Sequence, residues 1–180
     1  MKDMTQIIEW LLKMETAAAI LYDKAAAHFS SDREFAEFIR QLGREEQQHL
    51  EMMQRAAQVV KGMGEIAPAI TIDRVVEESI EEGNFASCKK RLEERSLTKD
   101  EMMECVVATE FSEWNDIFLY VINVMKRGFR EFIPAVARMQ QHKKSIERFL
   151  ETRPEFNAHL EKVRELADIW QEKILIVDDE

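Results

Sequence analysis

Glu46 and His49 are the residues best suited to chemistry, because they form a Glu-x-x-His pair in the stretch Glu45-Glu46-Gln47-Gln48-His49. Residues three positions apart on a helix share a face, so this carboxylate and this imidazole can hold one metal ion between them. A carboxylate buried alone is costly, and a cation removes much of that cost. The pair therefore predicts a metal site, provided that its helix turns both side chains towards the interior of a helical bundle.

Further acids and a second histidine extend this pattern along the chain. Glu15 lies upstream of the pair, and the other candidates lie downstream at Glu110, Glu113 and His142. The separation from Glu15 to His49 is about 34 positions and that from Glu110 to His142 about 32, which indicates a duplicated helix hairpin. Each copy places a lone Glu on its first helix and a His on its second.

The spacing of apolar residues predicts four long helices that carry these side chains. The helices, each with its candidate ligands, are expected at about 5–29 (Glu15), 32–61 (Glu46 and His49), 98–127 (Glu110 and Glu113) and 131–151 (His142). Glu15, Glu46 and Glu110 each interrupt an otherwise apolar stripe, whereas a solvated Glu belongs on the opposite side of a helix. The expected stripe of the fourth helix includes Ile133, Met139 and His142.

Local signals place the helix ends and the connections between the helices. Asp32 is an expected N-cap, and Thr98 with Glu101 matches a capping box. A long connection between the second and third helices is expected to hold short helices at about 74–82 and 85–94. A further helix at about 155–171 follows the fourth. We expect one helical domain over 1–172 and a short extended tail over 173–180.

Composition limits the class of protein. The chain has 180 residues, 46% of them hydrophobic, which suits one domain with a substantial core. Its net charge of -10 argues against nucleic acid or an anionic membrane as the main partner. Cys88 and Cys105 form no Cys-x-x-Cys pair, and the pattern of residues leads us to expect neither a signal peptide nor a membrane-spanning run. A reducing, cytoplasmic setting is therefore expected, with a homodimer as the simplest assembly.

With these residues in place, the sequence resembles the ferritin-like di-iron carboxylate proteins, most closely their rubrerythrin-related branch without the rubredoxin-like domain. Glu15 with Tyr22, followed by Glu46 and His49, matches the first half-site of that family. The resemblance covers the four long helices and implies an all-α, ferritin-like four-helix bundle. It also implies that Glu110 is the lone glutamate of the second half-site.

Within the second half-site, the resemblance assigns two further ligands and shows one departure. Glu113 lies where rubrerythrins carry an additional carboxylate ligand, and His142 matches the second histidine. Met139 stands where the family has the Glu of its second Glu-x-x-His, and a thioether is a poor ligand for oxygen-loving iron. Either Glu113 substitutes for that acid, or the second ion binds weakly, or the site holds one metal or none.

The resemblance implies iron, two ions if the site is intact, with manganese or zinc as alternatives. It further implies reduction of hydrogen peroxide, or iron oxidation by oxygen, with electrons from an external donor. Two other interpretations stay open: a metal-binding protein whose incomplete second half-site slows turnover, and a structural helical bundle that keeps only remnants of a site.

Overall fold

All regular structure in the described part of the chain is helical. The computed structural model describes residues 3–62, 83–111 and 113–164, apart from the side chains of residues 84, 113–115 and 136. Its elements are α1 (Met4–His28), α2 (Arg33–Gly62), α4 (Asn84–Glu93), α5 (Lys99–Glu110), α6 (Glu113–Lys126), the 3-10 turn η1 (Arg130–Phe132), α7 (Ile133–Glu151) and the 3-10 turn η2 (Pro154–Phe156). Residues 157–164 are again helical. The expected all-α class is confirmed.

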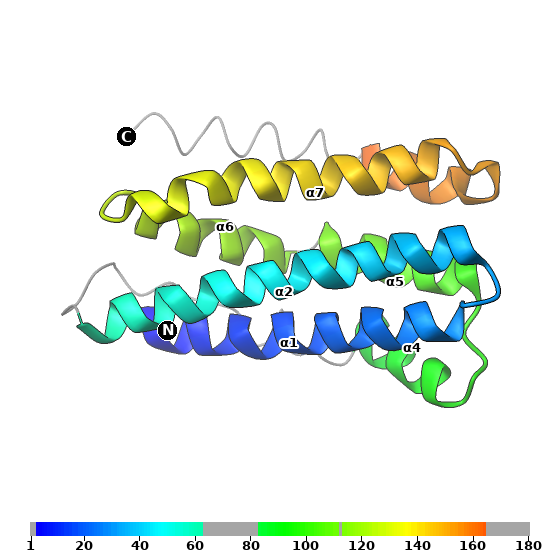
Figure 1. Cartoon of the computed structure of the whole chain (residues 1–180), viewed down its shortest axis with the longest axis horizontal. Helices are drawn as coiled ribbons and strands as arrows, with labels where there is room; N and C mark the ends of the chain where they lie inside the picture. Colours follow the sequence, from blue (N-terminus) through cyan, green and yellow to red (C-terminus); the bar gives the residue numbers. More distant parts are fainter. Residues whose placement is uncertain (1–2, 63–82, 112, 165–180) are drawn as a thin grey trace.

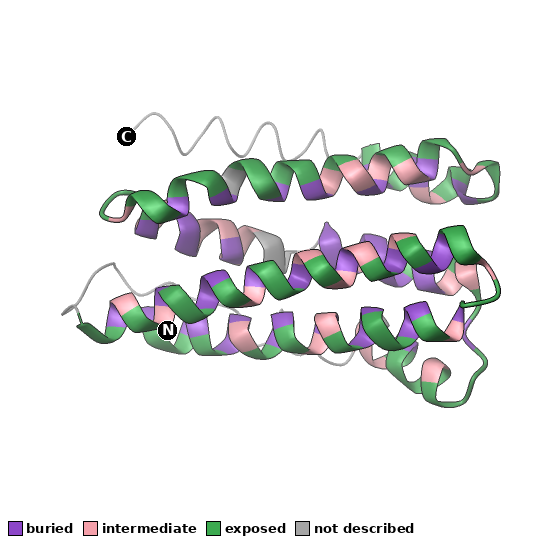
Figure 2. Cartoon of the chain, viewed as in Figure 1, coloured by how far each residue is buried: buried purple, intermediate pink, exposed green. Residues whose placement is uncertain are grey.

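The long helices lie side by side along the molecule (Figure 1). α1 and α2 form an antiparallel pair that packs along its length. α5 and α6 follow one another in the same direction, and α7 runs back beside α6. Buried residues gather on the helix faces that are turned towards one another (Figure 2). The four helical rows therefore enclose one interior, into which their apolar stripes project.

The capping signals are confirmed and explain where two helices begin. The Asp32 side chain accepts a hydrogen bond of 3.1 Å from the Phe35 backbone N–H at the start of α2. Thr98 and Glu101 form a reciprocal capping box at the start of α5. Pro134 lies in the first turn of α7, where its missing N–H costs no helical hydrogen bond.

The third long helix is not continuous, contrary to the sequence prediction of one helix over 98–127. α5 ends at Glu110, and Phe111 leaves the helical region at φ -116° and ψ 25° before α6 begins at Glu113. The sequence from Thr109 to Glu113 contains neither Gly nor Pro, so no local signal marks the break. The break removes the helical turn that was expected to place Glu113 beside Glu110.

Ile133 is a second correction, because it was expected in the buried stripe of the fourth helix. Its side chain is 56% exposed. The residues up to Phe132 form a 3-10 turn, and α7 begins only at Ile133, so the helical periodicity that predicts burial does not yet apply there. Phe132, which is 1% exposed, takes the core position instead.

An aromatic cluster joins the turn between α1 and α2 to the end of α7. Phe35 packs edge-on against Phe29 with ring centroids 4.9 Å apart, and it also contacts Phe149 and Phe156. Phe38 stacks on Phe149 at 3.7 Å with nearly parallel rings. Aromatic pairs of this kind stabilise beyond their buried area by about 0.5–1.5 kcal/mol each. The cluster holds α2 against α7, the two helices that carry both candidate histidines.

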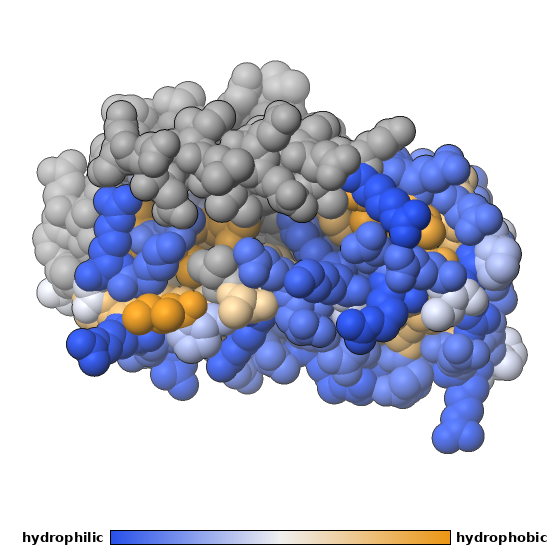
Figure 3. Space-filling model, turned by 90° about the horizontal axis from the view of Figure 1, so that it is seen from above, coloured by the Kyte–Doolittle hydropathy of each residue, from blue (hydrophilic) through white to orange (hydrophobic). Residues whose placement is uncertain are grey.

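The surface agrees with the high content of charged residues. Figure 3 shows mostly hydrophilic side chains over the described residues on one face, interrupted by a few apolar areas. Within the described residues, no helix is both long and apolar enough to cross a bilayer. The expected short helix at 74–82, residues 165–171 of the last helix and the tail at 173–180 lie outside the described residues.

Candidate metal centre

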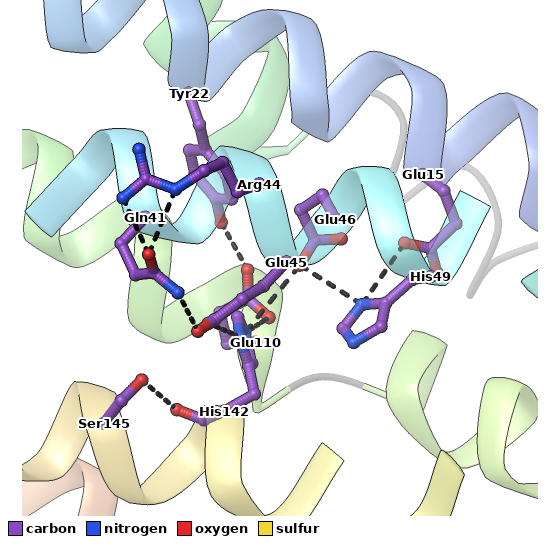
Figure 4. A network of polar contacts seen from close by, with 10 residues as sticks. All are labelled: Glu15, Tyr22, Gln41, Arg44, Glu45, Glu46, His49, Glu110, His142 and Ser145. Atoms are coloured by element: carbon purple, nitrogen blue, oxygen red, sulfur yellow. Dashed lines mark hydrogen bonds and ion pairs between the residues drawn. The ribbon is translucent and has the colours of Figure 1, made fainter. Parts of the chain in front are cut away.

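The first half of the candidate site lies between α1 and α2 (Figure 4). Glu15 comes from α1, and Glu46 with His49 comes from one turn of α2. The Nδ1 atom of His49 lies 3.7 Å from Oε2 of Glu15 and 3.4 Å from Oε1 of Glu46. All three side chains are buried, at 1%, 2% and 5% exposure in chain order. The expectation that these three side chains share one interior position is confirmed.

In the second half of the candidate site, Glu110 at the end of α5 contacts His142 of α7. Nε2 of His142 lies 2.8 Å from Oε2 of Glu110 and 3.7 Å from Oε1 of Glu46. Both Glu110 and His142 are 2% exposed. The two histidine rings lie 5.4 Å apart between centroids, so the two halves form one continuous site.

Glu46 belongs to both halves. Glu15, Glu46 and His49 form one group of possible ligands, and Glu46, Glu110 and His142 form the other, each with its ligand atoms within 4.8 Å of one another. Ligand bonds of about 2.0–2.2 Å allow two ligands of one ion to lie up to about 4.4 Å apart, so each group needs only small adjustments. The donor set of carboxylate oxygens and imidazole nitrogens fits iron, manganese or zinc.

Two neighbouring side chains orient the second half. The Tyr22 hydroxyl donates a hydrogen bond of 2.5 Å to Oε1 of Glu110, while Oε2 of Glu110 faces His142. Oε2 of Glu45 lies 2.5 Å from Nδ1 of His142, which directs the other ring nitrogen towards Glu46 and Glu110. A carboxylate on the outer nitrogen of a ligand histidine fixes its tautomer and ring orientation.

Glu45 is itself held by hydrogen bonds to other side chains on the surface of α2. Gln41 donates a hydrogen bond of 2.6 Å from Nε2 to Oε1 of Glu45, and Arg44 donates to Oε1 of Gln41. Arg44 also pairs with Glu37 at 2.8 Å. This chain of contacts holds the Glu45 carboxylate in place on the solvent side of His142.

The buried charges shift the proton affinities of the site in the metal-free protein. Burial raises the pKa of Glu46 to about 7, although His49 acts in the opposite direction. Burial lowers the pKa of His142, but Glu110, Glu45 and Glu46 outweigh it and raise that pKa to about 10. Burial also lowers the pKa of His49, but Glu46 and Glu15 raise it more, so that this pKa lies well above its ordinary value. The metal-free site therefore retains protons that a divalent cation would displace.

In the second half, the structure is consistent with the departure at Met139 and leaves the role of Glu113 untested. Met139 is buried at 1% exposure and supplies no carboxylate, so the second group of ligands is completed by Glu46 from the other hairpin. The side chain of Glu113 lies outside the part of the chain that is described. Its expected role as an additional ligand stays a prediction.

Sequence reasoning missed Glu45 as a partner of the site. Glu45 is adjacent to Glu46 and lies off the buried stripe of α2, so helical periodicity points it to solvent. Lys143 was also missed: burial lowers the pKa of its amine to about 8, and the amine lies 5.2 Å from the centroid of the Phe111 ring. The only sequence signal for either residue is its position next to a candidate ligand.

In comparisons with known proteins, no protein-family model, no curated protein and no solved structure matches this chain. The site residues and their contacts are therefore the basis for any functional assignment.

Proposed function

We propose that this protein binds two metal ions in its interior, one in each of the groups that share Glu46. The observation that carries the proposal is this sharing: Oε1 of Glu46 lies 3.4 Å from a nitrogen of His49 and 3.7 Å from a nitrogen of His142. Both distances exceed the usual 2.9–3.0 Å of an N–H···O hydrogen bond, so a cation fits better between these atoms than a proton does.

Charge balance supports metal binding over a buried hydrogen-bond network. Glu15, Glu46 and Glu110 are almost fully buried together with two histidines. Keeping such a set in a protein interior requires either protonation or a cation, because desolvated carboxylates repel one another. Binding of two divalent ions would neutralise the carboxylates and release the protons held by Glu46, His49 and His142.

The architecture that we propose is a ferritin-like four-helix bundle of the rubrerythrin-related branch. The support is the arrangement of ligands: Glu15 and Glu110 come from the first helix of each hairpin, and His49 and His142 from the second. Lone glutamates and Glu-x-x-His pairs that project into a bundle core are the ligand pattern of di-iron carboxylate proteins. Met139 is the one position of this pattern without a suitable ligand.

The metal that we propose is iron, with manganese or zinc as alternative occupants, and the reaction is reduction of hydrogen peroxide or oxidation of iron by oxygen. Bound iron would supply redox chemistry and open coordination positions for the oxidant. The protein would supply burial that excludes bulk water, and Tyr22 and Glu45 would hold Glu110 and His142 in place. We propose a cytoplasmic homodimer that receives electrons from an external donor.

One observation favours a second candidate function, metal binding without efficient turnover. Met139 stands in place of the second shared acid of the family pattern, so within the described residues Glu46 alone would be a ligand common to both ions. With one shared acid instead of two, the pair of ions would have fewer anionic ligands than in the family pattern, and the second ion would be held more weakly. In this case the protein would store or sense a metal ion rather than reduce peroxide.

Metal content distinguishes the possibilities. The protein would be loaded anaerobically with ferrous iron, desalted and measured by mass spectrometry of the metal. We expect two irons per chain in the wild type, none in Glu46→Ala because both groups use Glu46, and one each in His49→Ala and His142→Ala. Glu51→Ala, which changes an exposed acid on the same helix, is the matched control and should retain two.

The iron content of the wild type decides between the two candidate functions. One iron in the wild type would support the second candidate, and iron-dependent turnover of peroxide would then be absent. No iron in the wild type, or equal loading of the wild type and Glu46→Ala, would overturn the proposed metal centre.

A further inference from the structure

The two cysteines of the chain lie on two packed helices, in the core beside the candidate metal centre. Cys88 lies on α4 and Cys105 on α5, and these two helices pack together. Their side chains are 3% and 1% exposed, and both are free thiols. The two thiols lie near enough to shift each other's pKa: Cys105 lowers that of Cys88, and Cys88 raises that of Cys105. Two cysteines that are far from a Cys-x-x-Cys pair in sequence thus become a dithiol in the fold.

Other contacts fix the orientation of this dithiol. The Cys88 thiol donates to the sulfur of Met102 at 3.8 Å, and Met102 lies three positions before Cys105 on the same face of α5. On its other side, the sulfur of Cys105 lies 4.0 Å from the Thr109 hydroxyl. Cys88 is therefore held over the face of α5 from which Cys105 projects.

We propose that Cys88 and Cys105 are a redox-active dithiol that hydrogen peroxide oxidises to an intramolecular disulfide. In the first step, the sulfur of Cys88 attacks one peroxide oxygen, the O–O bond breaks, and Cys88 becomes a sulfenic acid as one water leaves. In the second step, the sulfur of Cys105 attacks that of Cys88, the S–OH bond breaks and a second water leaves. The two thiols lose two electrons and two protons, which reduce one peroxide to two waters.

The opposite effects of the two thiols on each other indicate their roles. Cys105 lowers the pKa of the Cys88 thiol, against the effect of burial. Cys88 raises the pKa of Cys105 well above its ordinary value, and burial adds to this. Because the thiolate is the nucleophile, Cys88 is the group that attacks peroxide and Cys105 is the group that resolves the sulfenic acid.

The dithiol lies close to the candidate metal centre but does not require it. Cys105 is five positions before Glu110 on α5, and its thiol lies near enough to both Tyr22 and Glu110 for their charges to act on one another. The oxidation consumes peroxide without any metal, and a small thiol reductant such as glutathione would restore the dithiol. This chemistry suits a reducing compartment, in which disulfides are transient.

The test uses the full-length protein with all metal removed by a chelator. Folded protein would be exposed to hydrogen peroxide, quenched and unfolded, and its free thiols counted with a thiol-reactive reagent. We expect the count to fall from the two cysteines of the chain to none. The intact mass should decrease by two hydrogens, and digestion should yield one linked pair of peptides containing Cys88 and Cys105. Retention of both thiols in the folded protein would overturn the proposal and identify them as inert core residues.

Two variants test the assignment of roles. In Cys105→Ser, a sulfenic acid should persist on Cys88 and be trapped by dimedone. In the matched variant Cys88→Ser, the remaining Cys105 should stay reduced. Equal trapping in both variants, or trapping in Cys88→Ser alone, would overturn the assignment.

Equilibration of the wild type in glutathione buffers measures the redox state of the two cysteines without the use of variants. We expect a single two-electron transition to the internal disulfide. Two glutathione adducts per chain, without an internal disulfide, would overturn the dithiol. Because no metal is present in these experiments, a protein that forms the disulfide but binds no iron would refute the proposed metal centre alone.

Discussion

The outer ring nitrogen of His142 lies 2.5 Å from a carboxylate oxygen of Glu45, a residue 97 positions away on another helix. This contact connects α7 to α2 and leaves Nε2 of His142 directed at the candidate metal position. It also makes the two halves of the site unequal, because the residue that matches Glu45 in the second hairpin is Arg138.

Replacing Glu45 by Gln should weaken binding of the ion held by His142. The neutral amide cannot stabilise the orientation and basicity of the imidazole as a carboxylate does, and loss of such partners weakens metal binding by about 10–100-fold. Metal titration by calorimetry should show one weakened site and one unchanged site. The control Glu51→Gln should leave both unchanged, and equal weakening of both sites by Glu45→Gln would contradict the assignment of Glu45 to His142.

Supplying the missing acid at position 139 should strengthen the second site. In Met139→Glu the affinity for the second ion should rise by at least about tenfold, since a direct ligand should count for no less than an outer partner. The metal-free variant should be less stable than the wild type because it buries another carboxylate. Met139→Gln, which has the same shape without the charge, is the matched control. Unchanged affinity in Met139→Glu would show that position 139 does not face the ions.

The Tyr22 hydroxyl should stabilise the fold through Glu110. Tyr22→Phe removes a buried hydrogen bond to a carboxylate, which should lower the free energy of unfolding of the metal-free protein by about 1.5–3 kcal/mol. Denaturant unfolding measures this change. The same substitution in a Glu110→Gln background should cost less, and the difference between the two backgrounds gives the coupling between the residues. Identical costs in both backgrounds would exclude the interaction as a source of stability.

The metal-free protein should lose stability as the pH rises. The folded protein raises the pKa of Glu46 from 4.5 to about 7, so this contribution is complete below pH 4.5 and is lost as the pH passes through about 7. His142 is raised from 6.5 to about 10, and its contribution is complete below pH 6.5 and lost through about 10. Denaturant midpoints across this range measure both.

Variants separate the two windows of this pH dependence. Glu46→Gln should remove the loss between pH 4.5 and 7 and retain the loss at higher pH, while His142→Gln should do the reverse. Metal binding should release protons at neutral pH, which calorimetry in buffers of different ionisation enthalpy detects. A metal-free protein whose stability rises from pH 5 to pH 9 would contradict the charge assignments.

Gly43 marks the close approach of α1 and α2 next to Tyr22. A Cβ atom added there would lie 3.4 Å from Cβ of Tyr22 and 3.7 Å from the backbone nitrogen of Asp23. These are ordinary contact distances, so Gly43→Ala should fit and stabilise α2 by about 0.5–1 kcal/mol. Gly43→Leu cannot fit and should lower both stability and metal affinity by displacing Tyr22. Thermal unfolding of the two variants checks the direction, and a destabilising Ala would show that the helices are closer than described.

Much of the candidate site follows from local patterns. The helical stripes place Glu15, Glu46 and His49 in the interior because residues on one face of a helix recur at a period of 3.6, which is a property of the chain itself. The same reasoning places Glu110 and His142, and the burial of all five side chains agrees with it. Capping at Asp32 and Thr98 was also predictable, since each cap depends on residues within a few positions.

The remaining features depend on packing between distant segments. The interruption at Phe111 has no Gly or Pro within two positions, so tertiary contacts override the helical pattern there. The proximity of Cys88 and Cys105 likewise arises only from the packing of α4 on α5.

By itself the sequence determined an all-α chain whose helices turn three acids and two histidines inward, because helix periodicity and burial of apolar stripes are local physical rules. Only the tertiary structure decided that Glu46 serves both halves and that Glu45 supports His142. Those relationships depend on how two hairpins are placed against one another. The side-chain distances that result are set by packing in three dimensions and not by spacing along the chain.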